Sequence, residues 1–177
     1  MHDDASAKPA ATRLARRHVA GGLWTLLLFV TLGAALEALH GFKADSYLNV
    51  ENEARRLMWR LAHAHGTLLA LLHVVCGVLV SAGHLVVASR LRLALGSLSA
   101  ALLLIPGGFF LGGVVLVGGE PGPGVLLVPA GAVCLVAGVL LAALSVRSAP
   151  STNASPGAAT RDPRDSASSS STAEPGS

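Results

Sequence analysis

Long apolar stretches alternate with short polar or Gly/Pro-rich segments through the middle of this 177-residue chain. An α-helix rises about 1.5 Å per residue, so roughly 20 apolar residues cross a hydrocarbon core about 30 Å thick. Backbone groups inside a bilayer must be bonded within the protein, which favours helices. The pattern therefore predicts an all-α, polytopic membrane protein with four transmembrane helices in an up-down bundle, at residues 19–39, 61–89, 93–117 and 125–146.

The distribution of charge argues against a soluble fold. Apolar residues make up 52% of the chain and charged residues 13%, against about 25% charged residues in an average soluble domain. Between Arg92 and Arg147 the one charged side chain is that of Glu120. The net charge is +3, but the basic residues flank apolar stretches and do not form a patch with interleaved aromatics. We therefore expect the lipid bilayer, and no nucleic acid, as a partner.

Composition divides the chain into three parts. Residues 18–147 hold the apolar stretches and predict the transmembrane domain. Residues 1–17 are polar and Ala-rich, and residues 148–177 are rich in Ser, Pro and Ala. Because such segments bury too little apolar surface to offset the entropy lost on ordering, both ends are predicted to be disordered. The glycines and prolines of residues 118–124 predict a tight turn between the third and fourth spans.

Basic residues near the span ends predict the orientation in the membrane, because cytoplasmic loops carry an excess of Lys and Arg. The loop at residues 41–57 has bases diluted by acids, and the turn at residues 118–124 has no base. This pattern predicts a bacterial inner-membrane protein with both termini in the cytoplasm. A cleaved signal peptide is an alternative for the first span, although its apolar run exceeds the usual 7–15 residues or so. The bases on the predicted cytoplasmic side are Lys8, Arg13, Arg16, Arg17, Arg90, Arg92 and Arg147.

Ionisable side chains inside the predicted spans gather on the first two helices. Such groups are costly in a bilayer, so each is a functional hypothesis. The first helix carries two of them, three residues apart and hence on one face. The second carries four histidines, three of which fall on a stripe of small and polar residues. These residues are Glu37 and His40 in the first span and His63, His65, His73 and His84 in the second.

If these two helices pack antiparallel through Gly33 and Gly66, their polar residues converge near the outer end of the pair. Imidazole and carboxylate are ligands of Zn, Cu and Fe. His63 and His65 project about 200° apart, so on a regular helix only one of them faces a shared ion. The pattern predicts a transition metal or haem site with candidate ligands Glu37, His40, His63 and His65.

Two other interpretations of these residues stay open. In the first, Glu37 pairs with an arginine at the interface, and the histidines form hydrogen bonds between helices. In the second, the polar residues line a path for protons or a solute. The arginines available for the first are Arg55, Arg56 and Arg60.

Catalytic machinery is not evident in the sequence. It contains no nucleophile elbow, phosphate-binding loop, dinucleotide fingerprint or zinc-protease motif, so we predict no catalytic residues and favour a protein that is not an enzyme. Cys76 and Cys134 lie in apolar stretches and are expected to behave as small hydrophobes. The sequence thus predicts an integral membrane protein that binds a metal or haem, or alternatively a structural or assembly partner without a cofactor. A membrane-protein partner or a homo-oligomer is compatible with either role.

Two segments carry a resemblance to known proteins: Leu36–Lys43, which reads LEALHGFK, and Arg55–Leu69, which reads RRLMWRLAHAHGTLL. Over residues 18–146 the chain resembles small, uncharacterised bacterial membrane proteins with four helices. Residues 62–69 are also similar to the His-Ala-His segments of relatives of the haem-copper oxidase large subunit. That second similarity covers one helix, and it implies no ligand in this chain.

Overall fold

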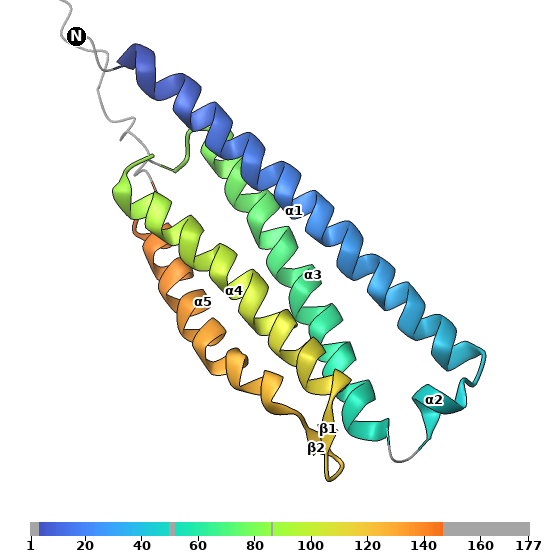
Figure 1. Ribbon diagram of the computed structural model, residues 1–177. Coiled ribbons are helices and arrows are strands. Elements are labelled where there is room, and N and C mark those ends of the chain that lie inside the picture. Colours follow the sequence, from blue (N-terminus) through green and yellow to red (C-terminus); the bar gives the residue numbers. More distant parts are fainter. Residues whose placement is uncertain (1–3, 50–51, 86, 147–177) are drawn as a thin grey trace, which may run out of the picture. The chain divides into compact units, whose positions relative to one another are not determined.

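The computed structural model describes residues 4–49, 52–85 and 87–146, and this part of the chain contains four long helices (Figure 1). Each is long and apolar enough to cross a membrane, the last together with the short 3-10 helix before it. The predicted all-α membrane fold is therefore confirmed. The long helices are α1 (Asp4–Gly41), α3 (Glu53–Ser81), α4 (Ser89–Val114) and α5 (Leu127–Ala143); the short elements are α2 (Asp45–Leu48), β1 (Leu116–Val117), β2 (Glu120–Pro121) and the 3-10 helix η2 (Pro123–Leu126).

The four long helices lie side by side in chain order, each antiparallel to the next (Figure 1). α1 packs on α3, α3 on α4, and α4 on α5. The two middle helices are therefore covered on two sides, and the two outer helices mainly on one. The outer helices expose large apolar side chains such as Trp24, which is 73% exposed. Since lipid tails are as apolar as leucine, a bilayer accommodates such a surface.

The core lies between α3 and α4. Leu91, Leu95 and Leu98 follow one face of α4 at helical spacing and are at most 2% exposed. They pack with Cys76 and Val80 of α3. In a membrane this packing stabilises the fold through close van der Waals contact, because burial from lipid gives no hydrophobic driving force. The core thus fixes how α3 and α4 are aligned along each other.

The beginning of α1 differs from the prediction. The sequence predicts disorder over residues 1–17, but α1 begins at Asp4. Alanine, arginine and lysine have high helix propensities, and this segment is rich in them. Ala15 is also 4% exposed and belongs to the core cluster of α3 and α4, so packing anchors this part of the helix. The predicted disorder of residues 148–177 lies outside the described residues.

The end of α3 also differs from the prediction. The second span is predicted to run to residue 89, but α3 ends at Ser81. Gly83 has a φ of 75°, a left-handed conformation that glycine adopts without steric cost. Its N–H donates to Val80 O at 3.1 Å, and the N–H of His84 donates to Leu79 O at 3.0 Å. These two bonds form a Schellman motif, which ends the helix. His84 is therefore an exposed residue of the α3–α4 connection and not part of an intramembrane stripe.

The turn predicted at residues 118–124 is confirmed, and it contains a short hairpin. β1 pairs antiparallel with β2. Gly118 and Gly119 connect the two strands with φ angles of 63° and 88°, as a type I′ turn requires. The N–H of Gly122 then donates to Gly112 O at 2.9 Å and ties the hairpin to α4. The third span, predicted at residues 93–117, is the helix α4, which begins earlier, at Ser89, ends at Val114 and contains Pro106.

Candidate functional site

Glycines allow α1 and α3 to approach closely. A Cβ atom added at Gly22 of α1 would lie 2.9 Å from the carbonyl oxygen of Ala70 in α3. Conversely, a Cβ atom at Gly77 of α3 would lie 2.9 Å from the carbonyl oxygen of Ala15 in α1. In both places the obstacle is backbone, which cannot move aside as a side chain can. Small residues at such positions are typical of membrane helix pairs.

The same interface confirms the predicted contact through Gly33 and Gly66. Gly33 of α1 lies against the imidazole ring of His63, and Gly66 of α3 lies against the ring of Phe29. An aromatic or imidazole ring of the opposite helix therefore packs against each glycine. This exchange aligns Gly33 with His63 and sets the register of the antiparallel pair.

His63 is held by a hydrogen bond across this interface. Its Nδ1 lies 2.7 Å from the backbone oxygen of Phe29. Because a carbonyl oxygen only accepts, Nδ1 must carry the proton and donate. In the tautomer with this single ring proton, the free lone pair is on Nε2. His63 is half-buried, so this bond both fixes the ring and satisfies a polar group between two membrane helices.

Beside His63 is an open hollow of about 130 Å³ at the end of the bundle that carries α2 and the hairpin. Glu37 and His63 line it, and Arg60 lines it as well. The structure thus brings together one predicted carboxylate ligand and one predicted imidazole ligand. A guanidinium group shares their hollow, which disfavours a bound cation through like-charge repulsion.

The other two candidate ligands lie elsewhere. His40 is exposed near the end of α1. Because Gly33 aligns with His63, His40 stands seven residues, or about 10 Å, farther along α1. The Nδ1 of His65 bonds to Leu61 O of its own helix at 2.9 Å, and its ring lies 5.1 Å from that of Phe109 on α4. His65 therefore faces α4, as its angular offset from His63 requires.

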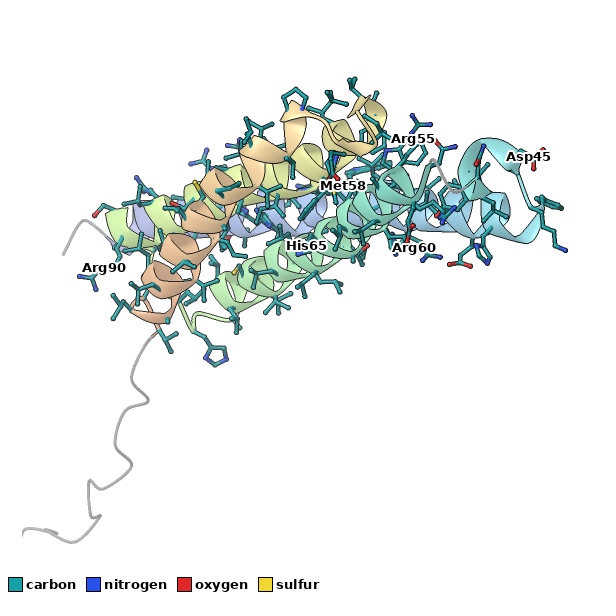
Figure 2. All side chains as sticks on the ribbon, turned by 90° about the horizontal axis from the view of Figure 1, so that it is seen from below. Asp45, Arg55, Met58, Arg60, His65 and Arg90 are labelled. Atoms are coloured by element: carbon teal, nitrogen blue, oxygen red, sulfur yellow. The ribbon has the colours of Figure 1, made fainter. Side chains whose placement is uncertain are left out.

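Within residues 4–49, 52–85 and 87–146, no group of three or more His, Cys, Asp or Glu side chains is placed to hold a metal ion. Two of the three arginines considered as partners of Glu37 bind backbone oxygens instead. Arg55 donates to Gly113 O at 3.0 Å, and Arg56 donates to Tyr47 O at 3.1 Å. Arg60 is the arginine that shares a hollow with Glu37, and Figure 2 shows it with Arg55 near the start of α3.

A second polar cluster lies deeper, where α1, α3 and α4 meet. His73 is 4% exposed, and its Nδ1 donates to Leu69 O at 2.9 Å. Its Nε2 lies 3.2 Å from Ser99 Oγ on α4. The ring of His18 on α1 has its centroid 5.5 Å from that of His73. The sequence pattern indicates His73 but not Ser99, because a single serine in an apolar span is a common residue with no distinctive spacing.

The Ser99 hydroxyl has two acceptors in reach. It lies 2.9 Å from Leu95 O as well as 3.2 Å from the Nε2 of His73. The hydroxyl has one proton, so it donates to one of these acceptors at a time when the imidazole is neutral. Donation to the Nε2 of His73 links α4 to α3, whereas donation to Leu95 O stays within α4.

A third set of contacts, which sequence analysis missed, joins the start of α3 to the end of α4. The indole N–H of Trp59 donates to Phe110 O at 3.3 Å, and the two rings stack at 5.9 Å. Arg55 lies 5.8 Å from the Trp59 ring centroid, a cation–π distance. Gly113 packs directly against the indole. The sequence feature that could have indicated these contacts is the Gly112-Gly113 pair, because two glycines leave space for a large ring.

Comparison of the chain with models of protein families, with curated proteins and with solved structures found no match. The resemblance to four-helix bacterial membrane proteins therefore stays a prediction.

Proposed function

We propose that this protein is a structural or assembly component of a membrane, in which the intramembrane histidines hold helices together without a cofactor. The observation that carries the proposal is the bonding of His63 and His73. His63 bonds to the backbone of α1, and His73 bonds to its own helix and to Ser99 of α4. Each ring therefore makes a contact that joins two helices without a cofactor, and in His73 both ring nitrogens are engaged in such bonds.

The arrangement of the helices supports the same proposal. α1 and α5 each have one main packing neighbour among the described helices. Their remaining apolar surface is available to lipid or to the helices of a membrane-protein partner. Arg55 and Trp59 of α3 also donate hydrogen bonds to backbone oxygens of α4, as expected of residues that stabilise the packing of two helices.

Metal analysis and an optical spectrum of the full-length protein, purified in a neutral detergent, test the proposal. We expect no stoichiometric metal and no Soret band. His63→Ala should lower the free energy of unfolding by about 1 kcal/mol, because an interhelical hydrogen bond in a membrane contributes roughly that much. His84→Ala is the matched control: its ring is exposed outside the helices, so stability should stay unchanged. Stoichiometric metal or haem that His63→Ala removes would overturn the proposal.

A metal or haem site is the second candidate function. The observation in its favour is that Glu37 and His63 line one hollow, with the Nε2 lone pair of His63 uncommitted in the tautomer described above. Such a site needs further ligands from a bound molecule or a second chain. The same metal analysis decides between the two candidates.

We further propose that the protein resides in a bacterial inner membrane with both termini in the cytoplasm, on the basis of the positive-inside rule. Ala88 and Glu120 are exposed in connections at opposite ends of α4. In a background without native cysteines, Glu120→Cys should react with a membrane-impermeant thiol reagent applied to intact cells. Ala88→Cys should react only after the membrane is opened. The reverse pattern would show that the proposed orientation is inverted.

A further inference from the structure

Two adjoining hollows run between α1 and α4, which both pack on α3 more than on each other. The first, of about 270 Å³, lies at the end of the bundle where α1 begins. The second, of about 240 Å³, lies deeper along α1. Arg17 lines both, so together they form one groove, named here the α1–α4 groove.

The shallow part of the groove concentrates positive charge. Arg13 and Arg17 project from consecutive turns of α1, and Arg92 comes from the first turn of α4. All three side chains are exposed, and the described part of the chain supplies no carboxylate to this lining. Three guanidinium groups around one hollow are suited to a phosphate, which accepts paired hydrogen bonds from arginine.

The deeper part of the groove has a different character. Leu102 and Leu103 of α4 line one side, and Gly21 and Thr25 of α1 line the other. The polar cluster of His18, His73 and Ser99 also borders this part. From Arg13 to Thr25 the helix advances about 18 Å at 1.5 Å per residue. One leaflet of a hydrocarbon core about 30 Å thick measures roughly 15 Å. The whole groove, from its charged mouth to the channel beside the leucines, is therefore about as long as one leaflet is deep.

We propose that the α1–α4 groove binds one phospholipid with an anionic headgroup. The phosphate contacts Arg13, Arg17 and Arg92, and one acyl chain lies along Gly21 and the leucines of α4. Basic pockets between membrane helices recognise anionic headgroups in this way. The apolar channel selects a lipid over a soluble phosphate, because a free anion leaves it unfilled. The site is separate from the His63 interface, and its deeper part borders the contact between His73 and Ser99.

Binding of fluorescent phosphatidylglycerol to the full-length protein in neutral detergent tests the charged mouth. Arg13→Gln and Arg92→Gln should each weaken binding about fivefold, as expected for one basic side chain near an anionic lipid. Arg16→Gln is the matched control, since Arg16 has the same charge and is exposed on the same helix but does not line the groove. Phosphatidylcholine should bind much more weakly than phosphatidylglycerol. An equal effect of Arg16→Gln and Arg92→Gln would indicate nonspecific surface charge and overturn the proposal.

A second variant tests the acyl channel. No heavy atom lies within 4 Å of the place where a Cβ atom would stand at Gly21, so Gly21→Leu fills the groove without displacing backbone. Phosphatidylglycerol should bind at least tenfold more weakly to this variant. Glycerol phosphate should compete poorly with the lipid for the unsubstituted protein. If Gly21→Leu has no effect and glycerol phosphate competes fully, the ligand is a soluble phosphate and the lipid assignment fails.

Discussion

Gly77→Leu should lower the free energy of unfolding by about 3 kcal/mol, the upper part of the range for overpacking a tight interface. A Cβ atom at this position would lie 2.9 Å from Ala15 O and 3.0 Å from Val19 N, both in the backbone of α1. Backbone cannot rotate away, so α1 and α3 must separate. Unfolding in mixed micelles with a denaturing detergent measures the loss.

Gly96→Leu is the control for this substitution. Gly96 is an exposed glycine of α4, and no heavy atom lies within 4 Å of the position of an added Cβ atom. The free energy of unfolding of the Gly96→Leu variant should stay within about 0.5 kcal/mol of that of the unsubstituted protein, as for surface changes away from packed contacts. Equal losses in the two variants would mean that α1 and α3 do not meet at Gly77.

Gly122→Ala should destabilise the second half of the bundle by about 2–3 kcal/mol, again through overpacking. The φ of Gly122 is −69°, which alanine adopts freely, so the backbone conformation is no obstacle. The added Cβ atom would instead overlap the carbonyl oxygen of Val115. The hairpin must shift, and the 2.9 Å hydrogen bond from Gly122 N–H to Gly112 O is lost with it.

Glu120→Ala, in the same hairpin, provides the comparison. Its side chain is exposed, so removing it should change the free energy of unfolding by no more than about 0.5 kcal/mol. The same unfolding assay serves both variants. Unchanged stability of Gly122→Ala would show that the hairpin does not pack closely on the end of α4.

The sequence predicted the number and type of helices because membrane thickness imposes a length that apolar runs reveal directly. It did not predict where α3 ends. Leu85 and Val87 continue the apolar run beyond Gly83, so hydropathy alone extends the helix. The break comes from the left-handed conformation of Gly83, a backbone property that an average over residue types does not detect. The polar composition before the first span favours disorder, whereas its high helix propensity and the packing of Ala15 favour the helix that forms there.

The candidate site was predictable in part. The small-residue pattern located the α1–α3 interface at Gly33 and Gly66, because close backbone approach requires glycine there. It did not give the register of the two helices. Once Gly33 aligns with His63, the geometry of an antiparallel pair places His40 about 10 Å away along the axis. The sequence also does not predict that Ser99 is the partner of His73, because that contact depends on how α4 is rotated about its axis relative to α3.

The packing of each long helix on the next one in the chain has a consequence for biosynthesis. Nascent membrane proteins emerge from the amino terminus onward, and here each long helix after α1 packs against the long helix that was made just before it. No helix must wait for a distant segment, so contacts stay local in sequence, a property associated with rapid folding. The Gly118–Gly119 turn shortens the last step further, because it delivers α5 directly beside α4.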